Sequence, residues 1–344
     1  MAKSKATTRA AAGSIRMRSR FGRKRPPLHS FKRIAGRPGR KRHSRSKKSM
    51  RGMLLPVKRK GAGKNLTVTA TGVKLQAKID EARYEGGEQL LEQTLPPNTI
   101  LPDIGLREVI AAGVEAMRPR LVNVLDAQAV YNEIKHALNE GLPFSMVRLG
   151  DGELLALAQD TVYPAGEILE RGPFLPYAGI HPPNLAARDE LAQAIRNANL
   201  VGVPVSRRIY FGQLLHPALN GLNINLRSLR LCRSTVNYEL HEAGLLPDLI
   251  RGRKLLLVGN KARGLAQRLG EKGFTVTAVI SPVRGFLDIG MVMEEVRKAD
   301  FDLALIAAGI PAVVLASRIA AEMKKTALDI GHMADRLVDG RAVI

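Results

Sequence analysis

Two acidic residues stand two positions apart, directly after an apolar segment near the middle of the chain. Residues 144–149 read FSMVRL, and Asp151 and Glu153 follow within the sequence GDGE. Two carboxylates at this spacing suit a hard divalent cation, Mg²⁺ or Mn²⁺, which can bridge to the oxygens of a diphosphate. The pair therefore predicts a metal site that also serves catalysis, placed where a strand ends.

The neighbours of this pair fit the same interpretation. Gly150 and Gly152 allow the backbone to turn tightly and to approach a ligand closely. Arg148 can bind phosphate in a bidentate manner, and its charge favours ionised carboxylates on Asp151 and Glu153. An ordinary helix start accounts for the same residues without a ligand, with Asp151 as the cap and Glu153 in the first turn.

Two further candidate sites lie near the carboxyl end of the chain. In AAGIP, Gly309 ends an apolar segment and Pro311 starts a helical one, which leaves main-chain N–H groups where a phosphate could bind. In DIGH, Gly331 permits a close turn, while Asp329 and His332 could contact a ribose, a phosphate or an acceptor hydroxyl, or transfer a proton. An ordinary turn and a structural His beside a capping Asp explain the same residues.

A fourth polar segment starts at Ser234 and contains Asn237, whose amide could bind the edge of a sugar or a base. A dinucleotide fingerprint is not present, because Gly259 and Gly264 alone do not make the G-x-G-x-x-G pattern. The only cysteine, Cys232, stands beside an arginine that would lower its thiol pKa, although a small core residue is the commoner case.

Continuous apolar segments alternate with amphipathic ones over the carboxyl-terminal two thirds of the chain. The pattern predicts strands at 144–149, 199–205, 253–260, 275–280, 300–309 and 326–331, and helices at 126–139, 185–198, 262–273, 290–299 and 310–324. Such alternation indicates an α/β, Rossmann-like fold whose mostly parallel sheet has helices on both faces. Ligands of these sheets lie beyond the carboxyl ends of the strands, where all four candidate sites fall.

The chain begins with a strongly basic segment. Residues 1–64 contain 23 Lys or Arg and no Asp or Glu, so the other 280 residues have equal numbers of basic and acidic residues. We expect a disordered tail at 1–64, and at 65–125 a connector with a short strand at 65–73 and a helix at 105–117. The tail is either a solubilising extension or a segment that binds a polyanion such as nucleic acid or an anionic surface.

Two motifs of the body resemble those of the GT-D fold glycosyltransferases, a bacterial family. The matching segments are SMVRLGDGELLALAQ at 145–159 and LALIAAGIPAVVLASRIAAEMKKTALDIGHMADRL at 303–337. The resemblance spans about residues 120 to 340 and implies a glycosyltransferase domain at 126–344. It further implies that Asp151 and Glu153 hold the Mn²⁺ or Mg²⁺ of a UDP-sugar, whose sugar passes to a hydroxyl of a glycan or glycoprotein.

The remaining site residues follow from the resemblance position by position. The matching residues are Arg148, Gly150, Gly152, Asn237, Asp329, Gly331 and His332. The family has an Arg after the central Asn, where this chain has Tyr238, so another cation such as Arg233 or Arg207 would bind the donor phosphate. His332 is then the candidate catalytic base, and main-chain donors near Gly309 would assist the leaving diphosphate.

Two alternative functions account for parts of the same sequence. A non-catalytic protein could be directed by its cationic tail to nucleic acid or to a polyanionic cell or spore surface. A glycoside hydrolase could use Asp151 and Glu153 as acid and base, which their expected ionisation beside Arg148 disfavours. One cysteine, no signal-peptide pattern and no apolar segment of transmembrane length predict a cytoplasmic protein without a membrane span.

Overall fold

The computed structural model describes residues 70–344, with side chains from residue 75 onward. Two compact units divide the chain, Met1–Ala82 and Arg83–Ile344. The expected disordered tail at 1–64 lies outside the described residues. No helix among the described residues is long and apolar enough to cross a membrane.

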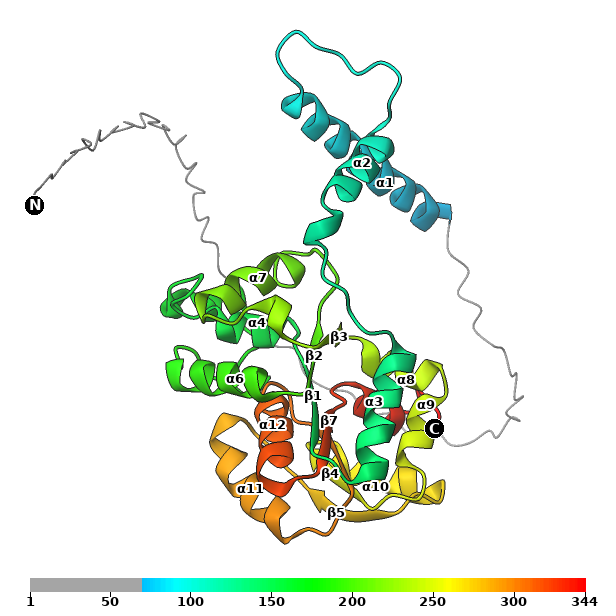
Figure 1. Ribbon diagram of the computed structural model, residues 1–344, viewed down its shortest axis with the longest axis vertical. Coiled ribbons are helices and arrows are strands. Elements are labelled where there is room, and N and C mark those ends of the chain that lie inside the picture. Colours follow the sequence, from blue (N-terminus) through cyan, green and yellow to red (C-terminus); the bar gives the residue numbers. More distant parts are fainter. Residues whose placement is uncertain (1–69) are drawn as a thin grey trace, which may run out of the picture. The chain divides into compact units, whose positions relative to one another are not determined.

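A seven-stranded parallel sheet forms the centre of the second unit (Figure 1). The strand order is β3-β2-β1-β7-β6-β4-β5, so the first and last strands of the chain, β1 and β7, are neighbours. The strands are β1 (Phe144–Arg148), β2 (Leu200–Val203), β3 (Leu231–Arg233), β4 (Leu255–Gly259), β5 (Val276–Ile280), β6 (Leu303–Ala307) and β7 (Thr326–Asp329). Because every pair is parallel, the carboxyl ends of all seven strands meet at one edge.

Helices cover both faces of this sheet, and successive strand residues point to opposite faces. On β1, Val147 packs into the core on one face and Met146 into the core on the other. The first face is covered by α4 (Asp151–Leu157), α6 (Leu185–Asn197), α7 (Gly212–Gly221), α11 (Ile289–Lys298) and α12 (Pro311–Met323). The second face is covered by α3 (Ala127–Glu140), α8 (Val236–Glu242), α9 (Leu245–Ile250), α10 (Ala262–Glu271) and α13 (Met333–Val338). The α/β fold with a parallel sheet, predicted from the sequence, is confirmed.

Helix α3 shows how local sequence sets an element that leads into the site. The Asp126 carboxylate accepts a hydrogen bond from the Ala129 N–H at 2.8 Å and caps the helix, and Gly141 ends it in the left-handed region at φ 64°. Val130 and Ile134 on the inner face are fully buried, as their spacing predicts. The chain then turns directly into β1.

The segment before α3 differs from the sequence-based expectation. Residues 70–73, expected in a strand, belong to the long helix α1 (Ala70–Thr94). The Lys, Ala, Glu, Gln and Leu residues that follow are strong helix formers and outweigh the short alternation of Thr and Val. The helix expected at 105–117 is confirmed as α2 (Leu106–Ala116).

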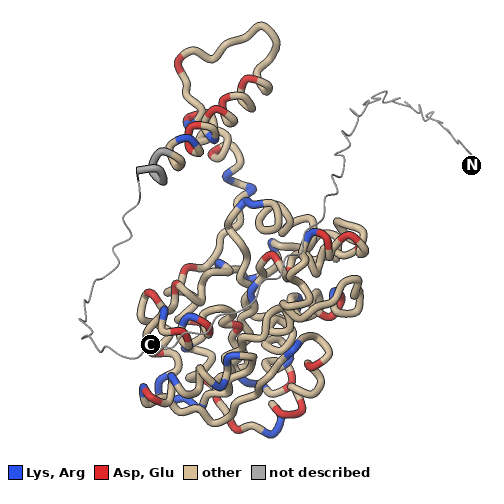
Figure 2. The backbone as a smooth tube through the Cα atoms, turned by 180° about the vertical axis from the view of Figure 1, so that it is seen from behind, with Lys and Arg blue, Asp and Glu red and all other residues tan. Residues whose placement is uncertain are grey.

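Short elements complete the described residues. They are η1 (Arg118–Arg120), η2 (Ala165–Glu167), α5 (Ile168–Arg171), η3 (Leu226–Ser228) and η4 (Phe286–Asp288). Figure 2 shows basic and acidic residues interspersed along the backbone from α3 onward. That agrees with the equal numbers of basic and acidic residues after residue 64.

Candidate active site

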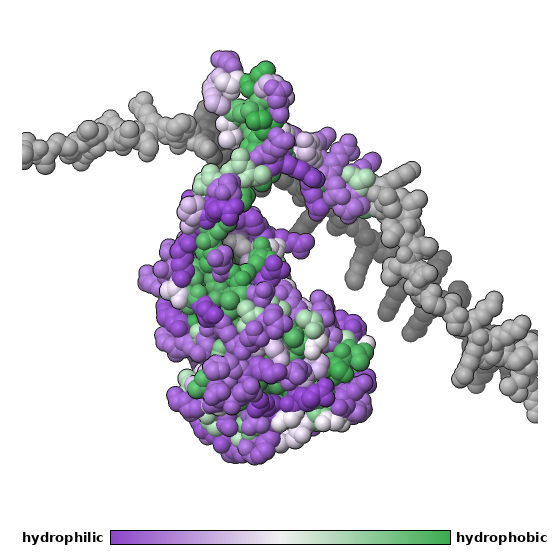
Figure 3. All heavy atoms as spheres, turned by 45° about the vertical axis from the view of Figure 1, so that its right-hand side comes forward, coloured by the Kyte–Doolittle hydropathy of each residue, from purple (hydrophilic) through white to green (hydrophobic). Residues whose placement is uncertain are grey.

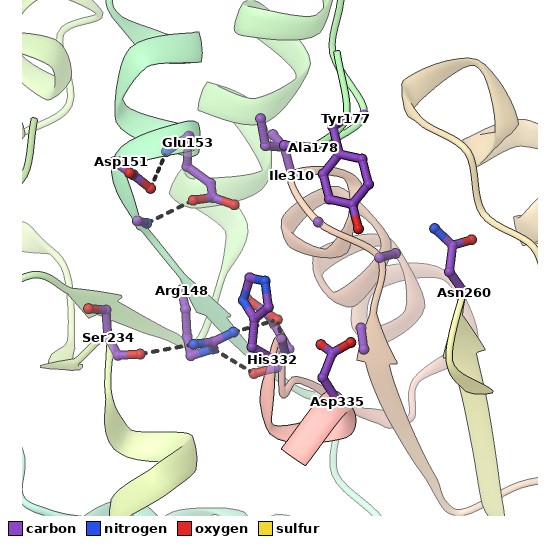
Figure 4. Close-up of a pocket in the computed structure, with 18 of the residues that line it drawn as sticks. Arg148, Asp151, Glu153, Tyr177, Ala178, Ser234, Asn260, Ile310, His332 and Asp335 are labelled. Atoms are coloured by element: carbon purple, nitrogen blue, oxygen red, sulfur yellow. Dashed lines mark hydrogen bonds and ion pairs between the residues drawn. The ribbon is translucent and has the colours of Figure 1, made fainter. Parts of the chain in front are cut away.

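A pocket of about 540 Å³ lies at the carboxyl ends of the strands (Figure 4). Residues that follow six of the seven strands line it, those after β2 being the exception. The segment Phe174–Gly179, after α5, adds another part of the wall. Its size is that of a small-molecule site, and its position is the one that the sequence analysis predicts for chemistry.

Arg148 joins three strand ends at the base of this pocket. Its Nε donates to the main-chain oxygen of Asp329 at 2.9 Å, and its Nη2 donates to the Asp329 carboxylate at 3.0 Å. Its Nη1 donates to the main-chain oxygen of Ser234 at 3.0 Å. The side chains of Arg148 and Asp329 are only 15% and 6% exposed, so β1, β3 and β7 are connected by a largely buried ion pair.

Two glycines make room for the Arg148 side chain. A Cβ atom at Gly331 would lie 1.9 Å from Nη2 of Arg148, and a Cβ atom at Gly202 would lie 3.0 Å from its Cγ. Gly331 also has a positive φ of 44°, and its N–H donates to the Asp329 carboxylate at 2.9 Å. Gly331 is therefore required by the close approach of Arg148 and by the turn itself.

Asp151 and Glu153 lie in the first turn of α4 and face the pocket. The Gly150 N–H donates to Oε2 of Glu153 at 2.8 Å, and the Gly152 N–H donates to Oδ1 of Asp151 at 3.0 Å. The other oxygen of each carboxylate accepts no hydrogen bond from another described residue. Both acids thus satisfy the helix-start interpretation, with Gly150 rather than Asp151 at the cap position, and each keeps an oxygen for a ligand.

Glu153 loses its proton less readily than we expect from the sequence. Burial of its carboxyl group, followed by the negative charge of Asp329, raises the pKa of Glu153 from 4.5 to about 7. Main-chain hydrogen bonds from Glu153 itself and from Gly150 lower this pKa in part, and the charge of Arg148 lowers it least. The expectation that Arg148 keeps both carboxylates ionised is therefore wrong for Glu153.

The donor set fits a cation that shares its ligands with a substrate. No group of three or more His, Cys, Asp or Glu residues suited to a metal occurs in the described part of the chain. Asp151 and Glu153 offer two carboxylates, and Mg²⁺ is commonly held by one or two carboxylates together with substrate phosphates. The desolvated Glu153 carboxyl gains from a positive charge beside it, which also suits a cation at this position.

Three charged residues of the pocket were not predicted from the sequence. Lys261 and Arg284 follow β4 and β5, and Asp335 lies in the first turn of α13. Lys261 makes no ion pair with any described residue, whereas Arg284 pairs with Asp288 at 3.2 Å. Applying the strand-end rule to every strand would have found Lys261 and Arg284. Tyr177, which is 95% exposed, lies in the proline-rich stretch 172–183, which the sequence suggests as part of an acceptor pocket.

Some of the residues predicted from the sequence line the pocket, and others lie behind its wall. His332, Gly309 and Asp329 line the pocket, and Figure 4 shows the exposed His332 ring extending into it. At Gly309, where φ is 63°, a Cβ atom would meet the main-chain oxygen of Ala178 at 2.6 Å. The Ile310 N–H donates to that same oxygen at 3.1 Å, so it is not free for a phosphate.

Asn237 supports the pocket without lining it. The residue is 2% exposed, and its Nδ2 donates to the main-chain oxygen of Ile330 at 2.8 Å, while its Oδ1 has no partner in the structure. Arg207 and Arg233, the alternative phosphate-binding residues, do not line the pocket. Cys232 is a core residue, and burial raises the pKa of its thiol to about 12.

Comparison with known proteins decides the family. The family model for the GT-D fold-like domain matches residues 125–337, which is more than half of the chain. The chain belongs to the GT-D-like family. The family predicted from the two sequence motifs, and with it the glycosyltransferase class, is confirmed.

Solved structures similar to the GT-D-like domain are those of a domain of unknown function, DUF1792. One, described as having a distinct glycosyltransferase fold, is 20% identical with a TM-score of 0.45, over 64% of this chain and 83% of that chain. Another, described as a new glycosyltransferase from Streptococcus sanguinis, is 19% identical with a TM-score of 0.44, over 64% of this chain and 86% of that chain. No curated protein sequence matches the chain.

Substituting Gly331 tests the packing around Arg148. Gly331→Ala should lower the free energy of unfolding by about 2–4 kcal/mol, because the methyl group displaces the buried guanidinium and the positive φ is strained. Chemical denaturation measures this change. Gly270→Ala is the matched control, since no atom lies within 4 Å of its Cβ position within α10, and it should be neutral or stabilising by up to about 1 kcal/mol. Equal effects of the two substitutions would contradict this account.

The raised pKa of Glu153 predicts a pH-dependent stability. The Glu153 pKa is about 7 in the folded state and 4.5 as the ordinary value, which we take for the unfolded state. The protonated carboxyl therefore contributes its full stabilisation below pH 4.5, and this contribution is lost as the pH rises through 7. Glu153→Gln keeps an oxygen for the Gly150 N–H and does not titrate. With a chelator present, the free energy of unfolding of the Glu153→Gln variant, relative to that of wild type, should increase by about 3 kcal/mol between pH 4.5 and 8. A difference that is constant with pH would show that the Glu153 pKa is not raised.

Proposed function

We propose that this glycosyltransferase moves a sugar from a nucleoside diphosphate, with UDP-sugar as the expected donor, to an acceptor hydroxyl. The observation that carries the proposal is the pair of carboxylates, Asp151 and Glu153, at the wall of a pocket of about 540 Å³. Each has one oxygen fixed by the main-chain N–H of a neighbouring glycine and one oxygen that accepts no hydrogen bond from another described residue. That arrangement supports a shared cation better than it supports a closed structural metal site.

Asp151 and Glu153 would hold Mn²⁺ or Mg²⁺ against the two phosphates of the donor. When bound, the cation would neutralise the charge that develops on the departing diphosphate. Lys261, which has no described carboxylate partner, is the pocket cation best placed to take the role that we expected of Arg207 or Arg233. Arg148 would act indirectly, because its guanidinium is already bonded to Asp329 and Ser234.

Two side chains that line the pocket could take a proton from an acceptor hydroxyl. His332 is exposed and extends into the pocket, and Asp335 stands one helical turn later on α13 (Figure 4). A base at either position could take the proton of an acceptor hydroxyl as it attacks the sugar. Glycans and glycoproteins, whose hydroxyls are such acceptors, are the expected partners.

One observation favours a second candidate. A carboxyl group with a pKa of about 7 is a property of general acids in glycoside hydrolysis, so Glu153 also suits a hydrolase. A hydrolase needs no nucleotide. Nucleotide binding therefore separates the two functions.

Calorimetric titration of UDP, with and without Mn²⁺, tests the proposed donor site. Wild-type protein should bind UDP more tightly with Mn²⁺, and Asp151→Ala/Glu153→Ala should lose that Mn²⁺-dependent gain, at least tenfold in Kd, because both carboxylate ligands are gone. Glu242→Gln is the control, since Glu242 is an exposed acid outside the pocket and should bind like wild type. Absence of binding by UDP and by other nucleoside diphosphates in wild-type protein would contradict the proposal and favour the hydrolase.

A further inference from the structure

Helix α2 presents an uncovered apolar stripe. Ile110, Val114 and Met117 follow one another at intervals of four and three residues, which places them on one side of the helix. Their exposed fractions are 55%, 53% and 50%, and the helix has no buried residue at all. Figure 3 shows apolar side chains at the surface of the segment that contains α1 and α2.

The rest of α2 defines the orientation of this stripe. Leu106 packs against α1: its Cδ2 atom lies 2.5 Å from the position that a Cβ atom at Gly87 would occupy. One flank of the apolar face of α2 is therefore partly covered. Glu108 and Glu115 lie on the opposite side of the helix. The stripe of Ile110, Val114 and Met117 is thus separated from the acidic residues of its own helix.

Cations stand at the carboxyl end of the stripe. Arg118 and Arg120 follow α2 directly, and Arg227 joins them by donating to the main-chain oxygens of Arg120 and Leu121 at 2.5 and 3.4 Å. Arg118 is paired with Glu115, but Arg120 and Arg227 have no carboxylate partner among the described residues. In the same chain, residues 1–64 contain 23 basic and no acidic residues.

We propose that the stripe of α2 docks into the headgroup boundary of an anionic lipid bilayer, with the cations beside it on the lipid headgroups. An anionic bilayer supplies both an apolar phase for Ile110, Val114 and Met117 and a negative surface for Arg120 and Arg227. Nucleic acid offers no such apolar phase.

Flotation of the full-length protein with vesicles tests this docking. Wild-type protein should bind vesicles of phosphatidylglycerol and phosphatidylcholine more strongly than vesicles of phosphatidylcholine alone, and added salt should weaken the binding. Ile110→Asp/Val114→Asp should lower the partition coefficient on the anionic vesicles about tenfold, because charged side chains replace the apolar contact. Leu287→Asp is the control: Leu287 is 95% exposed elsewhere in the chain, and the variant should bind like wild type.

Three outcomes would overturn the proposal. Unchanged binding by the double variant would mean that charge alone holds the protein on vesicles. Equal binding of wild-type protein to both vesicle types, or binding to neither, would exclude an anionic bilayer. Conversion of a dimer to a monomer by the double variant, with unchanged vesicle binding, would identify the stripe as a subunit interface. Circular dichroism checks folding, and Met117→Asp, at the end of the helix, repeats the test if the double variant unfolds.

Discussion

The ion pair between Arg148 and Asp329 is the interaction on which the geometry of the pocket depends. It joins the ends of the first and last strands of the sheet, and the third bond of the guanidinium, to Ser234, adds the end of β3. Its partners are neighbours only because β1 pairs with β7 in the sheet. The small residues at 202 and 331 follow from it, since larger ones would collide with the arginine. The loop that carries His332 starts from this pair and takes its position from it.

The ion pair with Asp329 occupies the guanidinium of Arg148, so Arg148 does not form an ion pair with Asp151 or Glu153. The carboxyl group of Glu153 faces burial and the negative charge of Asp329, and the charge of Arg148, which is bonded to Asp329, offsets these least. A pocket of this kind gains electrostatically from any cation placed between Asp151 and Glu153. The geometry thus links a structural ion pair to the proposed ligand binding: the arginine orients the site, and a cation and Lys261 would supply the positive charge that the site lacks.

The sequence was sufficient for the parts of the fold that are coded locally. Apolar runs predicted six strands, and Asp126 and Gly141 marked the two ends of α3 correctly. It was not sufficient for β3, which has three residues, or for the start of α1, where a short alternation suggested a strand. Local pattern also could not show that Arg148 pairs with an acid 181 positions away rather than with its neighbours. Likewise, local pattern could not show that the main-chain oxygen of Ala178 accepts a hydrogen bond from the Ile310 N–H, because tertiary structure alone brings these two segments together.

Crystals grown with UDP and Mn²⁺ would show whether Asp151 and Glu153 hold the cation of the donor, through the anomalous scattering of manganese. We expect an anomalous peak within about 2.5 Å of carboxylate oxygens of both Asp151 and Glu153, with diphosphate oxygens completing the coordination. It also predicts that Arg148 stays bonded to Asp329 in the complex. UDP bound in the pocket without a peak at these two residues, or a peak at another group of ligands, would contradict it.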